Sequence, residues 1–219
     1  MKRGDLSKKK LIIFDLDGTL INSLPYHTLA FLKVAELHGV KVPYKYVHSL
    51  MGKNSEQIFT HLKKEYGLKG DFSKLRIERR KIYDKILGKK DLSIPGVLRT
   101  LQYFKNKKIK FVLATGSSYS SYVRSTTKQF RKMFTLASTV DDVKHGKPSP
   151  EQMLYVIKKM KVKKQEVLAV GDSIYDAQAA KSAGVEFVGV KTGFEKGKPL
   201  KRYRHLAILN SVNEFQKIL

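Results

Sequence analysis

The chain has 219 residues, no cysteine, and 44 Lys and Arg against 19 Asp and Glu, which gives a formal net charge of +25. The lack of cysteine excludes disulfides and thiolate metal sites, and the length allows one large domain or a core with a smaller module. Residues 1–10 are charged and the apolar run behind them is short, so we expect neither a signal peptide nor a membrane span there, and we expect a cytoplasmic protein.

The positive charge is spread along the whole chain instead of being gathered in one block. No stretch has the composition of a basic tail, and no basic-aromatic RNA-binding motif occurs. We therefore interpret the excess as a solvated surface that steers phosphate-bearing ligands and attracts polyanions without specificity. A specific nucleic-acid partner is not expected.

The chain is organised around residues 11–20. Residues 11–14 form a short run of branched and aromatic side chains, which is typical of a strand buried on both faces of a parallel sheet. Asp15 and Asp17 follow it, and in open α/β sheets ligands bind beyond the carboxyl ends of the strands. Two carboxylates this close repel each other unless a cation or a shared proton relieves them. The alternative is an ordinary strand end with an Asx turn and a glycine.

Residues 24–88 contain no strand pattern. Helical spacing of apolar residues predicts helices at 24–38, 44–51, 55–66 and 72–88. After a Pro-Gly turn at 95–96, strands and helices alternate to the end of the chain. We expect strands within 110–117, 166–171, 185–190 and 206–209, and helices at 98–107, 118–132, around 153–157, at 173–183 and from about 211. Residues 191–204 are polar and are expected to form a loop.

Polar residues follow two more predicted strands and one loop. Thr115 and Gly116 end the second strand, Lys147 lies in Gly-Lys-Pro-Ser-Pro, and Asp172 and Asp176 follow the strand that ends at Gly171. Each has an ordinary structural alternative. A threonine at a strand end often caps the next helix, and a single lysine is a weak signal in a chain so rich in lysine.

In this order the four motifs resemble those of the haloacid dehalogenase superfamily, in its phosphatase branch. The match is to the subclass of phosphoglycolate phosphatase and beta-phosphoglucomutase, which has a helical cap. The resemblance implies an α/β fold, with a doubly wound parallel-sheet (Rossmann-like) core from residues 1–19 and 94–219. It also implies an inserted α-helical cap domain at 20–93.

The same resemblance implies hydrolysis of a small phosphate monoester through an aspartyl-phosphate. Asp15 would be the nucleophile and Asp17 the acid and base. Mg²⁺ would be held by Asp15, the backbone carbonyl of Asp17 and Asp172, with Asp176 in support. The phosphoryl group would be bound by Thr115, Lys147 and backbone amides near Leu16 and Gly116.

The residue two positions after the nucleophile also separates branches of the superfamily. Dehalogenases and phosphonatases do not keep an Asp there, so Asp17 favours phosphate esters. Two alternatives stay open: a beta-phosphoglucomutase-like phosphosugar mutase, and a non-catalytic basic protein on this fold that binds polyanions.

Substrate choice is assigned to the loop at 51–54. Gly52 permits a sharp turn, and Lys53 beside it is a candidate for pairing with a second anionic group of the substrate. The alternative is one solvated lysine among many. We expect a small phosphorylated metabolite as ligand, no membrane partner, and a monomer or small homo-oligomer.

Overall fold

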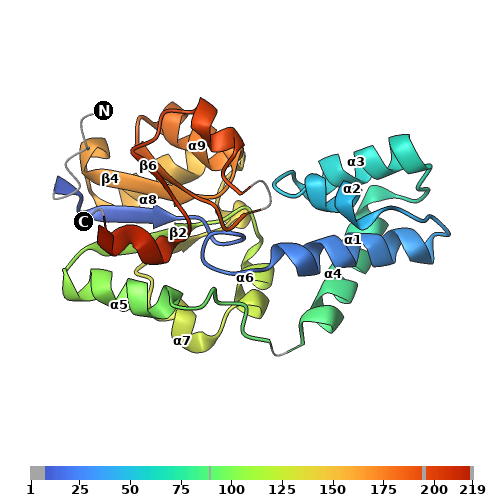
Figure 1. The fold of residues 1–219 in the computed structure, drawn as a ribbon. Coiled ribbons are helices and arrows are strands. Elements are labelled where there is room, and N and C mark those ends of the chain that lie inside the picture. Colours follow the sequence, from blue (N-terminus) through green and yellow to red (C-terminus); the bar gives the residue numbers. More distant parts are fainter. Residues whose placement is uncertain (1–7, 89, 194–195, 218–219) are drawn as a thin grey trace. The chain divides into compact units, whose positions relative to one another are not determined.

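The computed structural model describes residues 8–88, 90–193 and 196–217, and the chain divides into two compact units (Figure 1). The core unit consists of Met1–Asn22 and Asp91–Leu219, and the helical unit of Ser23–Lys90. Among the described residues, no helix combines the length and the apolar character that crossing a membrane requires.

The core unit is built on a parallel sheet whose described strands run in the order β3-β2-β1-β4-β5-β6. The first of the described strands therefore lies in the middle, with β2 on one side and β4 on the other (Figure 1). The predicted doubly wound α/β class is confirmed. The strands are β1 (Leu11–Phe14), β2 (Lys110–Ala114), β3 (Ala137–Ser138), β4 (Val167–Gly171), β5 (Glu186–Val190) and β6 (Ala207–Leu209).

Both faces of the sheet are covered at β1, which is apolar at every position. On one face, Leu11 and Ile13 pack in a cluster with apolar residues of α8 (Glu151–Met160) and α9 (Ile174–Ala183). On the other face, the Phe14 ring lies 6.0 Å from that of Phe104 in α5 (Val97–Asn106) and 6.3 Å from that of Phe215 in the 3₁₀ helix η5 (Val212–Lys217). The continuous apolar run reflects this burial on both sides.

The register of the sheet brings the ends of three strands together. Phe14 of β1 pairs with Leu113 of β2 and with Val170 of β4. The Asp15 amide then donates to the Val170 carbonyl at 2.9 Å. Residues that follow β1, β2 and β4 consequently share one edge of the sheet, where a ligand site is expected in this class of fold.

Helices make up the second unit, as the apolar spacing predicted. They are α1 (Leu24–Leu37), α2 (Tyr44–Ser49), α3 (Ser55–Tyr66) and α4 (Phe72–Leu87), packed around an apolar cluster that includes Phe31, Phe59 and Leu62. Local capping sets where two of them begin. The Asn54 side chain accepts from the Gln57 amide at the start of α3, and Asp71 accepts from the Ser73 and Lys74 amides at the start of α4.

Both junctions between the units lie inside the predicted cap boundaries of 20–93. Residues 20–22 and 91–93 fold with the core unit. Backbone bonds explain this: the Asn22 amide donates to the Leu92 carbonyl at 2.8 Å, and the Ile94 amide to the Leu20 carbonyl at 3.0 Å. The two connecting segments thus pair with each other before the helical unit begins.

Three details of the core unit differ from expectation. The single helix at 118–132 is wrong, since Thr126 and Thr127 are extended and divide it into α6 (Tyr119–Ser125) and α7 (Lys128–Arg131). The Thr127 side chain accepts from the Phe130 amide and so begins a new helix. The terminal helix is the 3₁₀ helix η5, and the expected loop at 191–204 contains another, η4 (Pro199–Arg202).

Candidate active site

A tight turn after β1 separates the two aspartates of the first motif. The Leu16 carbonyl accepts from the amides of Thr19, Leu20 and Ile21, and Gly18 adopts a left-handed φ of 86°. A residue with a side chain is disfavoured at such a φ, which explains the glycine. Because the chain curls here, Asp15 and Asp17 have different hydrogen-bond partners.

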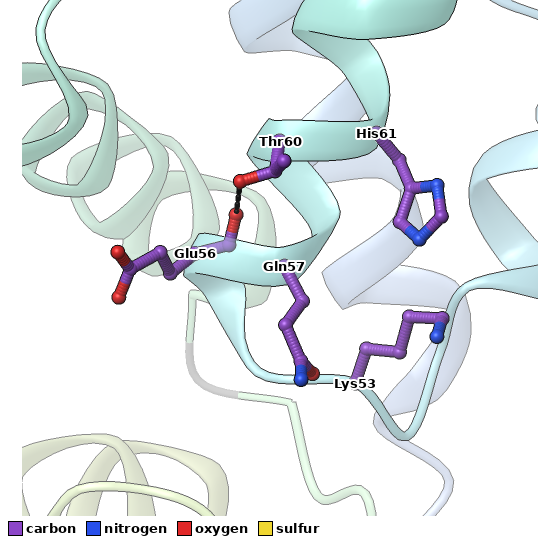
Figure 2. A pocket seen from close by; sticks show the side chains of 5 residues that line it. All are labelled: Lys53, Glu56, Gln57, Thr60 and His61. Atoms are coloured by element: carbon purple, nitrogen blue, oxygen red, sulfur yellow. Dashed lines mark hydrogen bonds between the residues drawn. The ribbon is translucent and has the colours of Figure 1, made fainter.

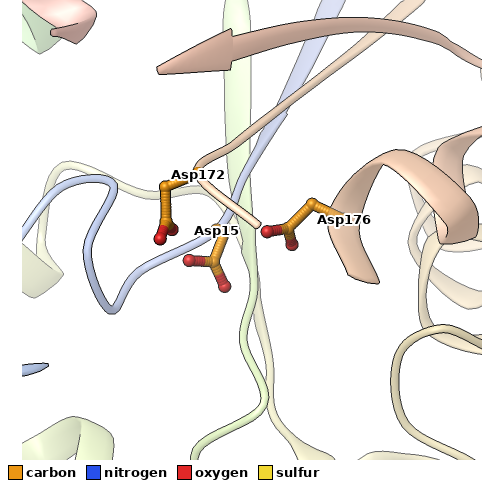
Figure 3. A group of neighbouring side chains, drawn as sticks. All are labelled: Asp15, Asp172 and Asp176. Atoms are coloured by element: carbon orange, nitrogen blue, oxygen red, sulfur yellow. The ribbon is translucent and has the colours of Figure 1, made fainter. Parts of the chain in front are cut away.

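Asp15 belongs to a compact group of three carboxylates. One oxygen each of Asp15, Asp172 and Asp176 lies within 4.8 Å of the other two, and Figure 3 shows the carboxylates converging from β1, β4 and the start of α9. Asp15 and Asp176 are buried and Asp172 is partly buried. The Asp17 side chain is not in this group. The cluster thus joins the first and fourth motifs.

Lys147 lies inside this cluster. Its ammonium is 2.7 Å from Oδ1 of Asp15 and 2.6 Å from Oδ1 of Asp176, and the lysine side chain is only 8% exposed. A buried ammonium between two carboxylates is stabilised by them and in turn offsets their charge. This position distinguishes Lys147 from the solvated lysines of the surface.

The cluster shifts the pKa values of its members. Burial raises the pKa of Asp15 from 3.8 to about 7, Lys147 opposes the rise, and Asp176 and Asp17 add to it. Burial, followed by the charges of Asp15 and Asp176, raises the pKa of Asp172. Burial disfavours the Lys147 ammonium, but Asp15 and Asp176 outweigh it, so the pKa of Lys147 is raised. One lysine therefore does not neutralise the carboxylates completely.

The donor set fits a hard cation. Carboxylate oxygens are the ligands that Mg²⁺ and Ca²⁺ prefer, and a bound cation would offset the burial and the mutual repulsion that raise the pKa values of Asp15 and Asp172. Thr19 joins the same two residues, since its Oγ1 lies 3.1 Å from Oδ2 of Asp15 and 2.8 Å from Oδ1 of Asp172. Nothing in the sequence pattern distinguishes Thr19 as a site residue, although it lies inside the first motif.

Asp176 is fixed from both sides. Its Oδ2 accepts from the Ser173 amide at 3.1 Å and from the Ser173 hydroxyl at 2.5 Å, while Oδ1 faces Lys147. Ser173 and Asp176 form a capping box at the start of α9. The helix terminus therefore holds Asp176 in the orientation that contacts Lys147.

Asp17 instead faces the loop after β2. The Ser117 hydroxyl donates to Oδ2 of Asp17 at 2.7 Å, and the Thr115 hydroxyl donates to the same oxygen at 3.3 Å. Ser118, and not Thr115, caps α6 by accepting from the Ser121 amide, so the alternative role of Thr115 as the helix cap is wrong. Ser117 was missed, and the run of hydroxyl residues at 117–118 was the only sequence signal for it.

A buried glutamine ties the second motif to the third. Gln152, in the first turn of α8, donates from Nε2 to the Thr115 carbonyl at 2.9 Å and to the Ser138 carbonyl at 3.1 Å. Gln152 is completely buried. It was not identified from the sequence because it stands among the apolar positions of a helix. It fixes the end of β2 against the helix that follows the Lys147 loop.

Gly52 and Lys53 belong to the helical unit. Gly52 has a left-handed φ of 99°, and Lys53 precedes the Asn54 cap of α3. Figure 2 shows the side chains of Lys53, Gln57 and His61 facing one space, with Glu56 turned away. A surface pocket of about 360 Å³ is lined by Lys53, Glu56, Gln57, Thr60 and His61.

Comparison with known proteins agrees with the motifs. Residues 12–190 match the model of the haloacid dehalogenase-like hydrolase family. A phosphorylated carbohydrates phosphatase of Thermotoga maritima is 30% identical over 195 residues, which cover 86% of this chain and 88% of the relative. A phosphoglycolate phosphatase of Vibrio parahaemolyticus is 27% identical over 96% of each chain.

Solved structures agree as well. The crystal structure of a putative beta-phosphoglucomutase from Thermotoga maritima has a TM-score of 0.77 and 27% identity, and the match covers 96% of this chain and 100% of that one. The predicted resemblance is thereby confirmed. The chain belongs to the haloacid dehalogenase-like hydrolases, and it stands with the phosphoric monoester hydrolases of that family.

Proposed function

We propose that this protein hydrolyses a small phosphate monoester through an aspartyl-phosphate on Asp15. The observation that carries the proposal is the Lys147 ammonium, shared at 2.7 and 2.6 Å between Asp15 and Asp176 inside a buried carboxylate cluster at the ends of β1 and β4. A carboxylate is a weak nucleophile, so positioning and charge neutralisation have to supply most of the catalysis.

In the first step, an Asp15 oxygen attacks phosphorus and the bond to the leaving oxygen breaks. Asp17 donates a proton to that oxygen. In the second step, Asp17 takes a proton from water, the water oxygen attacks phosphorus, and the bond to Asp15 breaks. Phosphate leaves and both aspartates return to their starting state. The hydroxyls of Ser117 and Thr115 orient the Asp17 carboxylate.

Charge on the phosphoryl group is met by Lys147, with Thr115 and the backbone amides near Leu16 and Gly116 as further donors. Mg²⁺ would be held by Asp15, Asp172 and the Asp17 carbonyl, with Asp176 in support. When bound, it supplies positive charge that offsets the repulsion between nucleophile and phosphate. Thr19 keeps Asp15 and Asp172 in place.

The names of two relatives, which refer to phosphorylated carbohydrates and to phosphoglycolate, support a substrate class. We propose a small phosphorylated metabolite of this kind, a cytoplasmic location, and a monomer or small homo-oligomer. The helical unit is proposed as a cap. The charge of +25 raises the local concentration of such anions.

Phosphate release from a panel of phosphorylated sugars and 2-phosphoglycolate tests the proposal. We expect turnover with Mg²⁺, none with excess chelator, and inhibition by Ca²⁺, which takes more ligands at longer distances and disturbs the in-line geometry. Full activity in chelator would remove the metal assignment. Salt-sensitive binding of nucleic acid with no turnover on any ester would favour the non-catalytic polyanion binder instead.

A phosphosugar mutase is the second candidate, supported by the 27% identity to the putative beta-phosphoglucomutase. A mutase returns the phosphoryl group to the sugar, whereas a phosphatase gives it to water. For the phosphatase proposed here, we expect stoichiometric release of inorganic phosphate when glucose 1-phosphate or glucose 6-phosphate is consumed. Interconversion of the two esters without release would favour the mutase.

Lys53→Ala tests substrate selection. If Lys53 pairs with a second anionic group, kcat/KM falls for bisphosphates and phosphoglycolate by about ten- to a hundredfold, as expected for the loss of roughly 1.5–3 kcal/mol. Activity on p-nitrophenyl phosphate, which has no second anion, stays unchanged. Lys64→Ala is the matched control, because the Lys64 side chain of α3 is 80% exposed. Equal behaviour of both variants on every substrate would make Lys53 a surface residue.

A further inference from the structure

The loop after β5 lies directly against Asp172. A Cβ atom built on Gly193 would be 1.9 Å from Oδ2 of Asp172, 2.6 Å from its Cγ and 2.7 Å from its Cβ. Real Cβ contacts are essentially never shorter than 3.0 Å. Gly193 is buried and does not have a left-handed φ, so backbone conformation does not require glycine here. Glycine is required at this position because the Asp172 side chain occupies the space that a Cβ atom would need.

Both partners of this contact lie next to paired strands. The Lys191 amide, two residues before Gly193, donates to the Leu209 carbonyl at 2.9 Å and continues the pairing of β5 with β6. Asp172 directly follows β4, which pairs with β1 and β5. Rotation of the Asp172 side chain removes the contacts to Oδ2 and Cγ but not the one to Cβ. A methyl group at 193 therefore displaces the carboxylate, the loop, or both.

The other side of Asp172 is also occupied, because Oδ1 lies 2.8 Å from Oγ1 of Thr19. The carboxylate is thus confined between a hydroxyl of the first motif and the main chain of the loop after β5. We propose that Gly193 is a positioning residue for Asp172, and that the absence of a side chain there orients this carboxylate for a hard cation. The proposal rests on the metal site of the proposed function.

Gly189 offers a matched control in the same strand and loop region. A Cβ atom on Gly189 would lie 2.6 Å from Cδ1 of Leu200, which is an apolar side chain and not one of the clustered carboxylates. Gly189→Ala therefore introduces the same methyl group against the end of an apolar side chain. No atom of Asp172 is among the three that lie nearest to this Cβ atom.

The test measures Mg²⁺ binding to the metal-free protein by calorimetry, without substrate. We expect Gly193→Ala to raise the Kd for Mg²⁺ by roughly 10–100-fold, the range found when groups that orient metal ligands are altered. Gly189→Ala should lower the Tm and leave the Kd unchanged. Binding of Mg²⁺ by Gly193→Ala with the wild-type Kd would overturn the proposal.

A stability cycle covers the case in which Gly193→Ala folds but is too unstable for the binding measurement. Asp172→Gly removes every contacted atom of the side chain, so the loss of Tm caused by Gly193→Ala should shrink in the Asp172→Gly background. An equal loss in both backgrounds would place the conflict elsewhere and overturn the proposal. A double variant that fails to fold, when both single variants fold, would overturn it as well. Wild-type protein that binds Mg²⁺ but hydrolyses no ester would instead contradict the proposed function.

Discussion

Asp15→Asn is expected to leave less than about 1% of wild-type turnover, because the amide cannot form the covalent bond to phosphorus and the loss of a nucleophile commonly exceeds that of any supporting group. The fold should persist, since Asn has the same shape and can still accept from Lys147. Phosphate release and circular dichroism on the same preparation check both points. Retention of more than a few per cent of activity in a clean preparation would exclude Asp15 as nucleophile.

The same variant should be more stable than the wild type at neutral pH when metal is absent. The pKa of Asp15 is about 7 in the fold against 3.8 ordinarily, so between these values the folded state holds a proton that the unfolded chain has released. Ionisation of Asp15 therefore lowers the free energy of unfolding progressively from about pH 4 to pH 7, and the full penalty applies above pH 7.

Urea unfolding in chelator measures this effect. Asn removes the penalty, so we expect Asp15→Asn to exceed the wild type at pH 8 by more than about 1 kcal/mol, with a smaller difference at pH 5. A variant that is less stable than the wild type at pH 8 would mean that the ion pair with Lys147 outweighs the cost of burying the Asp15 carboxylate. Mg²⁺ should reduce the difference by stabilising only the wild type.

Asp17→Asn should slow the hydrolysis of alkyl phosphates by about 10²–10⁴-fold, the usual contribution of general acid and base catalysis. The penalty should be much smaller for formation of the phosphoenzyme from p-nitrophenyl phosphate, because nitrophenolate leaves without a proton. Rapid-quench measurement of the first turnover separates this step from hydrolysis, in which Asp17 also acts. The measurement is made on both esters with the same preparation.

The two esters act as controls for each other. A disturbed fold or a weakened metal site would slow both by the same factor, whereas loss of the acid slows the alkyl ester selectively. Equal penalties on the first turnover would therefore contradict the role of Asp17 as acid.

Most of the fold could be predicted from local sequence patterns. Four-residue and five-residue apolar runs located β1 and β4 because burial on both faces of a sheet leaves little choice of residue. The break at Thr126 and Thr127 was not visible, since their capping and extended conformation depend on hydroxyl bonds that the apolar spacing does not report. The same spacing cannot separate a 3₁₀ turn such as η5 from an α-helix.

The site residues likewise fall into those that the sequence predicts and those that it does not. Asp15, Lys147, Asp172 and Asp176 stand in recognisable motifs, and in the structure they lie together. Ser117, Gln152 and Gly193 were missed because each acts on a residue far away in the sequence. A glycine without a left-handed φ gives no local signal at all, and only the position of Asp172 explains it.

The central position of β1 also has a consequence for how the chain reaches its native state. Leu11 pairs with Lys110 and with Val167, so β1 acquires both of its neighbours only after the chain has been synthesised beyond β4. The helical unit, Ser23–Lys90, is continuous in sequence and rich in local contacts. Such segments fold fast, whereas contacts between distant residues form slowly. We expect the inserted helices to fold during synthesis, while the apolar β1 remains unpaired until β2 and β4 have been made.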